Sequence, residues 1–123
     1  RHQKKIEYTG AMNDLVYIHD GKLEVFMADH LSVNILYGSS GNFTRKEIDY
    51  VKGDMLYLFS DGYQDQFGGD HDKKYLRRRF LAKLLEIYEL PMMTQKEILE
   101  KNHREWMKDS LQTDDITVMG IRL

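Results

Sequence analysis

Short apolar runs dominate the first half of the chain, and their length is typical of strands. The sequence predicts strands at residues 6–11, 15–18, 23–27, 43–51 and 55–59. Asp20-Gly21 lies between the second and third runs and favours a two-residue hairpin turn, because both turn positions need positive φ. The run at 55–59 is apolar on both faces, so we expect a strand buried on both sides. Residues 31–42 are expected to form a loop.

Helical spacing replaces this pattern in the second half. An apolar residue recurs every three or four positions, which predicts an amphipathic helix that ends before Pro91. The recurring residues are Leu76, Phe80, Leu84 and Ile87 or Tyr88. The sequence then predicts a second helix from Thr94 to about residue 109. Thr94 and Glu97 have the spacing of a capping box there, and Met93 is placed to pack on Ile98.

The buried face of this second helix is expected to hold Ile98, Leu99, Asn102 or His103, and Trp106. Residues 116–123 would place apolar side chains on both faces of a strand, which predicts another inner strand. An order of several strands, two helices and one strand is typical of the α+β class. We therefore expect an antiparallel β sandwich flanked by helices, in a single domain over residues 1–123.

Composition and charge exclude several functions. With 18 Lys and Arg against 20 Asp and Glu, the net charge is −2, so we expect neither nucleic acid nor an anionic membrane surface as partner. The chain has no cysteine, which excludes disulfides, a thiolate zinc site and a cysteine nucleophile. No apolar run approaches the roughly 20 residues of a membrane span, and no secretory segment opens the chain. We expect a soluble, cytoplasmic domain that is a piece of a longer protein.

Acidic residues lie at the ends of two predicted strands. Asp61 directly follows the run at 55–59, and Asp114-Asp115 directly precede residues 116–123. If these strands are antiparallel neighbours, Asp61 and Asp114 meet at one edge of the sheet. Mg²⁺ and Mn²⁺ prefer such carboxylate oxygens, and Gly62 would let the backbone approach closely. The alternative is that Asp61-Gly62 forms a turn and Asp114-Asp115 forms a cap.

These residues resemble those of a known family. The segments 58–63 (Leu-Phe-Ser-Asp-Gly-Tyr) and 112–118 (Gln-Thr-Asp-Asp-Ile-Thr-Val), with Gly68-Gly69, are similar to motifs of the metal-dependent protein phosphatases. The resemblance is closer to the SpoIIE-like branch, which is related to protein phosphatase 2C. Residues 8–13, 52–54 and 95–99 resemble this branch as well.

The resemblance implies a binuclear Mn²⁺ or Mg²⁺ centre and a metal-activated water that attacks phosphoserine or phosphothreonine, without a catalytic side chain that forms a phospho-enzyme. Asp61 corresponds to a metal-bridging aspartate and Asp114 to the last metal-binding aspartate. Asp115 is expected to support the site or cap the loop, and Gly62 to contribute backbone. The implied partner is a phosphorylated bacterial signalling protein, such as an anti-sigma-factor antagonist. Residues 64–74 correspond to a variable flap near the substrate.

The resemblance covers only the C-terminal portion of the family's fold. Nothing in the chain corresponds to the family's first aspartates or its glycine-histidine-glycine segment. We therefore expect this chain alone to be inactive, and its uncovered apolar faces to favour self-association. One alternative is a non-catalytic interaction domain that keeps the fold, against which the retention of Asp61 and Asp114 argues. Another is a cyclase-like phosphotransfer domain, but the chain lacks a glycine-rich phosphate loop with a lysine.

Overall fold

The computed structural model describes residues 4–10, 13–29 and 44–123. The loop predicted at 31–42 lies outside these residues. The chain forms two compact units. The first, here called the strand unit, comprises Arg1–Leu58 and Met119–Leu123, and the second, called the helix unit, comprises Phe59–Val118. That residues 1–123 act as one domain stays a prediction.

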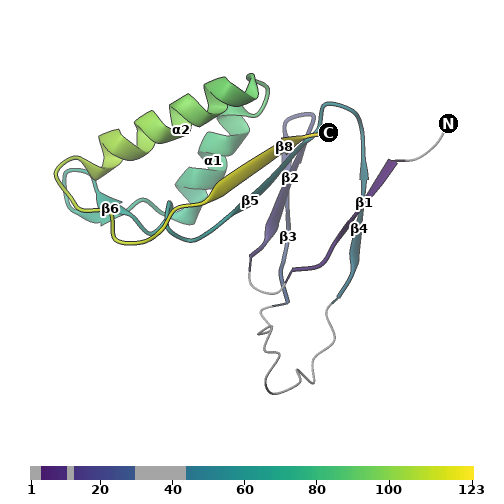
Figure 1. The fold of residues 1–123 in the computed structure, drawn as a ribbon, viewed down its shortest axis with the longest axis horizontal. Coiled ribbons are helices and arrows are strands. Elements are labelled where there is room, and N and C mark those ends of the chain that lie inside the picture. The colour runs from purple at the N-terminus through teal and green to yellow at the C-terminus, as the bar shows by residue number, and fades with distance from the viewer. Residues whose placement is uncertain (1–3, 11–12, 30–43) are drawn as a thin grey trace, which may run out of the picture. The chain divides into compact units, whose positions relative to one another are not determined.

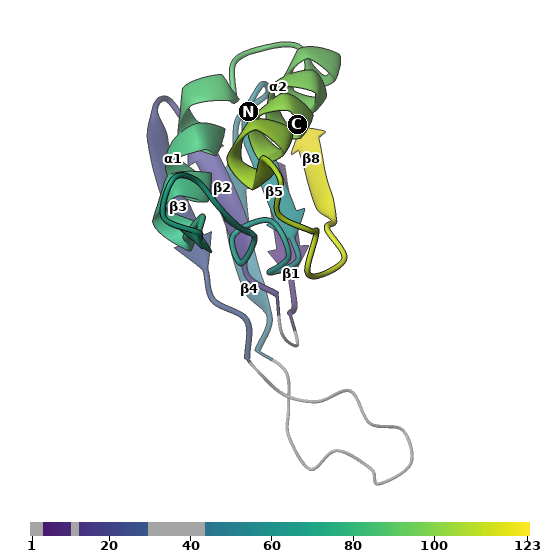
Figure 2. The same cartoon turned by 90° about the vertical axis from the view of Figure 1, so that its left-hand side faces the viewer.

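The strand unit contains two antiparallel sheets (Figure 1 and Figure 2). One sheet has the order β3-β2-β5-β8, and the other pairs β1 with β4. Their bounds are β1 Lys4–Tyr8, β2 Leu15–His19, β3 Lys22–Phe26, β4 Lys46–Tyr50, β5 Met55–Phe59 and β8 Val118–Arg122. Buried side chains from both sheets form one core: Tyr8, Leu15, Tyr17, Ile48 and Leu56. The two sheets therefore pack face to face, as in the predicted sandwich.

The predicted hairpin turn is confirmed. Asp20 and Gly21 both have positive φ, 45° and 74°, and the flanking residues His19 and Lys22 are paired. This is the backbone that a two-residue turn needs to match the twist of its strands.

The two strands predicted to be buried on both faces differ. β5 is buried as predicted, with Met55 fully buried and Tyr57 nearly so. β8 is not, because it lies at one end of the sheet order among the described strands, and Met119 and Ile121 are 52% and 42% exposed. Apolar residues at both phases do not distinguish an inner strand from an edge strand.

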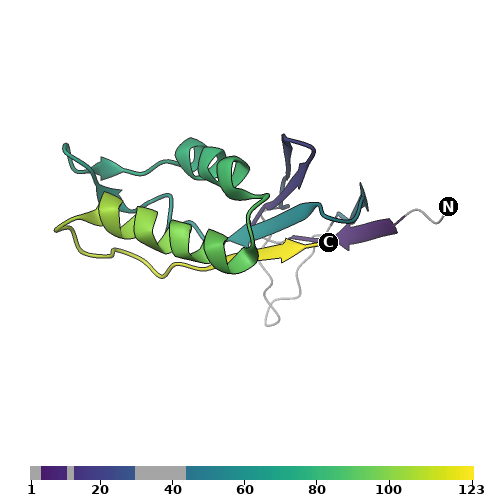
Figure 3. The ribbon, with the colours of Figure 1, turned by 90° about the horizontal axis from the view of Figure 1, so that it is seen from above.

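The helix unit contains α1 Arg77–Ile87 and α2 Met92–Met107, which lie side by side (Figure 3). The apolar stripe of α1 is confirmed, since Phe80, Leu84 and Ile87 are buried. Leu76 is the exception: it is the N-cap residue and 41% exposed. A short hairpin that the sequence pattern did not predict precedes α1, formed by β6 Phe67–Gly68 and β7 Lys73–Lys74.

The predicted start of α2 was wrong by two residues. The helix begins at Met92 with Pro91 as N-cap and no side-chain cap, so the capping box of Thr94 and Glu97 is not formed. Met93 is 64% exposed and provides no staple. Proline is favourable near the start of a helix because its fixed φ suits the first turn, and this advantage replaces the threonine cap.

The buried face of α2 is also narrower than predicted. Leu99 is buried, whereas the other expected core residues of this helix, Ile98, Asn102, His103 and Trp106, are half-buried. Gln95 is only 2% exposed, although the apolar pattern did not predict a buried side chain there. Within the described residues no helix combines the length and hydropathy that crossing a membrane would require. The mixed class with antiparallel sheets and two helices is confirmed.

Candidate metal-binding loops

Two loops carry the candidate ligands. The Asp61 loop, residues 60–65, follows β5, and the Asp114 loop, residues 112–117, precedes β8. Backbone bonds of Leu123 to Gly53 and Asp54 at the start of β5, and of Thr117 to Ser60 at its end, make the two strands antiparallel neighbours. This is the strand arrangement under which the sequence predicted that Asp61 and Asp114 meet; that the two side chains meet stays a prediction.

Ser60 joins the two loops. Its N–H donates to the carbonyl of Thr117 at 2.9 Å, and its hydroxyl oxygen accepts from the Thr117 N–H at 3.0 Å. The same hydroxyl donates to the carbonyl of Asp115 at 3.3 Å. Ser60 therefore acts as a bridge. Its hydroxyl proton and one lone pair are already engaged, in keeping with the inference that it is not a nucleophile.

Gly62 allows the loops to approach. A Cβ at this position would lie 2.1 Å from the carbonyl oxygen of Asp115 and 3.0 Å from Cγ1 of Ile116. The glycine is required for space here rather than for a left-handed backbone. The predicted close approach at Gly62 is therefore present, and its partner is the backbone of Asp115.

The candidate ligands Asp61 and Asp114 are both exposed. Oδ1 of Asp61 accepts from Nε2 of Gln64 at 3.3 Å, and the Asp61 carbonyl accepts from the Asp65 N–H at 2.9 Å. Oδ1 of Asp114 accepts from the N–H of Asp115, itself exposed, at 2.8 Å. The bonds of Asp61 are those of a turn. No helix of the described chain begins at Asp114, so the bond it accepts is not a helix cap. Oδ2 of Asp61 and Oδ2 of Asp114 have no hydrogen bond from the described residues.

The chemistry of these loops suits a hard divalent cation. Their donors are carboxylate and carbonyl oxygens, the ligands that Mg²⁺ and Mn²⁺ prefer. Gln112, Thr113, Asp114 and Asp115 line a shallow depression on the surface. The described part of the chain contains no cluster of three or more His, Asp or Glu side chains that could hold a metal ion. The residues present thus fit part of a carboxylate site.

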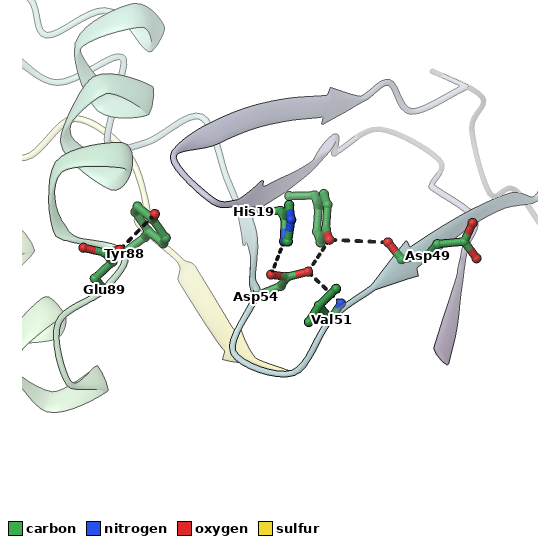
Figure 4. A network of polar contacts seen from close by, with 7 residues as sticks. His19, Asp49, Val51, Asp54, Tyr88 and Glu89 are labelled. Carbon is green, nitrogen blue, oxygen red and sulfur yellow. Dashed lines mark hydrogen bonds and ion pairs between the residues drawn. The ribbon is translucent and has the colours of Figure 1, made fainter. Parts of the chain in front are cut away.

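A second polar cluster lies in the strand unit around Asp54 (Figure 4). Asp54 is 6% exposed and accepts hydrogen bonds from the hydroxyl of Tyr17, from Nδ1 of His19 at 2.7 Å and from the N–H of Val51 at 2.8 Å. Burial alone would raise the pKa of Asp54, but these bonds outweigh burial and lower it. The cluster fixes the turn that leads into β5.

Sequence reasoning missed Gln64 and the Asp54 cluster. Lys52-Gly53-Asp54 was recognised as a turn, but nothing in its pattern indicates that Tyr17 and His19, 35 or more positions earlier, converge on Asp54. A spacing signal did exist for Gln64, since a side chain three positions after Asp61 can reach back across a turn.

Comparison with solved structures defines the class of fold. The chain is 25% identical to a structure titled SiaA-PP2C domain of Pseudomonas aeruginosa, and the two superpose with a TM-score of 0.87. The matched region covers 98% of this chain and 47% of that chain. Two structures of the SpoIIE phosphatase domain from Bacillus subtilis, each 15% identical, have TM-scores of 0.67 and 0.56. The match to the first covers 97% of this chain and 34% of that structure's chain, and the match to the second covers 96% and 50%. At this identity the two structures support the fold alone. The fold is that of PP2C-type phosphatase domains.

Sequence comparison then identifies the family. The family model of stage II sporulation protein E (SpoIIE) matches residues 1–123, so the chain belongs to the SpoIIE family. Comparison with curated proteins finds no match. The chain spans about half the length of the SiaA domain structure, or 47%. The predicted family is confirmed, and with it membership of a phosphatase family.

Proposed function

We propose that this chain is part of a metal-dependent serine/threonine phosphatase domain, which hydrolyses phosphoserine or phosphothreonine on a bacterial signalling protein. The observation that carries the proposal is the pairing of the Asp61 and Asp114 loops through Ser60. An anti-sigma-factor antagonist is the protein substrate that the family suggests.

Asp61 and Asp114 would hold Mn²⁺ or Mg²⁺ in the complete domain, with further ligands from residues outside this chain. Bound there, the cations would activate water for attack on phosphorus and neutralise charge on the phosphoryl oxygens. This chain's own contribution is to hold two carboxylates on loops that are hydrogen-bonded to each other. Ser60 fixes their spacing, Gly62 permits it, and Gln64 restrains the Asp61 side chain.

A non-catalytic interaction domain is the second candidate. The observation in its favour is that Oδ1 of Asp61 and Oδ1 of Asp114 already accept local hydrogen bonds. Metal binding separates the two candidates, because an interaction domain has no need of the free carboxylate oxygens.

The test is hydrolysis of a phosphoserine peptide with Mn²⁺, using the complete protein that carries this chain. Asp61→Asn and Asp114→Asn each remove a ligand charge while keeping the side-chain shape. We expect each to lower kcat at least about 100-fold, the scale of losing one group that stabilises developing charge. Asp109→Asn is the matched control, because Asp109 is exposed in the same unit but lies outside both loops. Wild-type turnover in Asp61→Asn or Asp114→Asn would exclude the proposal.

A further inference from the structure

Tyr63 ties the Asp61 loop to α2. It lies two residues after Asp61, and its side chain is only 3% exposed. Its hydroxyl donates to the carbonyl of Leu99 at 2.7 Å and accepts from Nδ2 of Asn102 at 2.8 Å. A phenol has a single proton to donate, so this hydroxyl is committed to α2 both as donor and as acceptor.

Asn102 holds a second tyrosine at the same time. Its Nδ2 also donates to the hydroxyl of Tyr75, at 3.0 Å, so both amide protons are used. The N–H of Tyr75 in turn donates to the carbonyl of Gln66. One side chain of α2 therefore contacts the segment 63–75 near both of its ends.

Packing also holds Tyr63 in place, because its ring lies 5.5 Å from that of Tyr75 and 4.6 Å from that of Phe80.

We propose that Asn102 is a positioning residue for the metal ligand Asp61, acting through the hydroxyl of Tyr63. The inference rests on the proposed function. The turn after Asp61 is closed by the bond from the Asp65 N–H to the Asp61 carbonyl, and Tyr63 is at its centre. Fixing Tyr63 against α2 fixes this turn. The orientation of the Asp61 carboxylate then does not have to be established when a cation binds.

The structure offers a matched pair of variants. Tyr63→Phe and Tyr75→Phe each remove one hydroxyl that accepts from Asn102, but only the Tyr63 hydroxyl lies on the path to Asp61. Asn102→Leu removes both bonds at similar volume. A purely structural network would make the two tyrosine variants equivalent, whereas a positioning role separates them.

Two readouts are needed, both in the complete protein. The first is the Mn²⁺ dissociation constant from calorimetry, and the second is the hydrogen-exchange rate of the Asp65 amide without metal. We expect Tyr63→Phe and Asn102→Leu to weaken Mn²⁺ binding about 10- to 100-fold, as loss of a ligand's supporting partner does, and to speed Asp65 exchange. Tyr75→Phe should leave both quantities within about twofold of wild type, even if it lowers the melting temperature.

The outcomes distinguish this inference from the proposed function. If Asp61→Asn loses Mn²⁺ binding while Tyr63→Phe and Asn102→Leu keep it, the positioning role is wrong and the phosphatase proposal stands. Equal losses in Tyr63→Phe and Tyr75→Phe also overturn the positioning role. If Asp61→Asn binds Mn²⁺ as tightly as the wild type does, both the positioning role and the phosphatase proposal are overturned. If Asn102→Leu does not fold, Asn102→Asp takes its place, because aspartate keeps the side-chain shape without the amide protons, whereas Tyr63→Phe also removes the bond to Leu99.

Discussion

At the scale of single residues, Gly62 has no room for a larger side chain. A Cβ at this position would clash with the backbone carbonyl of Asp115, which cannot rotate away as a flexible side chain can. A methyl group here must force the Asp61 and Asp114 loops apart.

We expect Gly62→Ala to lower the free energy of unfolding by about 1–3 kcal/mol and to weaken Mn²⁺ binding. Gly21→Ala is the control. Gly21 has open space around it but a φ of 74°, so alanine there introduces backbone strain only. Both variants should melt at lower temperature, and calorimetry should show weaker Mn²⁺ binding in Gly62→Ala alone. Unchanged binding in Gly62→Ala would mean that the loop spacing does not matter.

Asp54 should control the acid stability of the strand unit. Because its pKa in the folded chain is lowered, its carboxylate stabilises the fold above the unfolded pKa of about 4, and this contribution is lost as the pH falls through the folded pKa. We expect Asp54→Asn to cost about 1–3 kcal/mol at pH 7 and to flatten the decline in stability below pH 4.

Urea unfolding at pH 7 and pH 3 checks this prediction, with the exposed Asp109→Asn as control. The Asp54 carboxylate accepts from Tyr17, His19 and Val51, so asparagine keeps the shape but not the charge that these donors contact. A parallel decline in wild type and Asp54→Asn would show that Asp54 has no part in the pH dependence.

At the scale of elements, Gln95 links the two helices. It is 2% exposed, and its Nε2 donates to the carbonyls of Tyr88 at 3.1 Å and Leu90 at 2.8 Å, between the end of α1 and the start of α2. Carbonyls at the end of a helix have no partner within that helix, so a side chain from the next helix can satisfy them.

Gln95→Ala should therefore destabilise the helix unit by about 1–3 kcal/mol, the cost of removing a buried hydrogen-bonding group. Thr94→Ala should change stability by less than about 0.5 kcal/mol, since Thr94 makes no cap in this structure. Thermal unfolding of the two variants measures both effects. A loss of about 1 kcal/mol in Thr94→Ala, typical of a broken N-cap, would contradict the assigned helix start.

Element types were predictable from the sequence because each depends on local patterns. The stripe of Phe80, Leu84 and Ile87 and the Asp20-Gly21 turn are examples. The start of α2 was not predictable in this way, because a proline and a possible threonine cap lie close together. The helix begins after Pro91 and not at Thr94. The hairpin of β6 and β7 escaped prediction because its strands have two residues each and depend on α2, where Gly68 packs against Trp106.

At the scale of the whole molecule, β8 is exposed in a way that favours association. Met119 and Ile121 lie on one face of a strand at the end of the sheet order. We expect the 123-residue chain to self-associate at micromolar concentrations, and Ile121→Lys to reduce this, because a lysine on an edge strand opposes strand pairing. Sedimentation velocity measures the effect. Leu111→Lys is the control, as Leu111 is 84% exposed but lies outside the strands, and an equal reduction there would rule out β8.

The candidate site was only partly predictable for a related reason. Asp61 and Asp114 could be placed at one sheet edge because each adjoins a strongly apolar run, and the pairing of β5 with β8 agrees. The contacts that hold the loops depend on three-dimensional packing, as do those of Asn102 with Tyr63. No spacing in the sequence encodes a bond between residues 39 positions apart.

The bridge at Ser60 also sets the order of events during synthesis. Ser60 and Thr117 are 57 positions apart, so both helices must be made before the two loops can be joined. Closing a loop of this length costs roughly 3–4 kcal/mol of chain entropy, and formation of the neighbouring β5–β8 pair offsets it. Non-local pairing of this kind forms slowly and late. A nascent chain on the ribosome therefore cannot bring the Asp61 and Asp114 loops together until β8 has emerged.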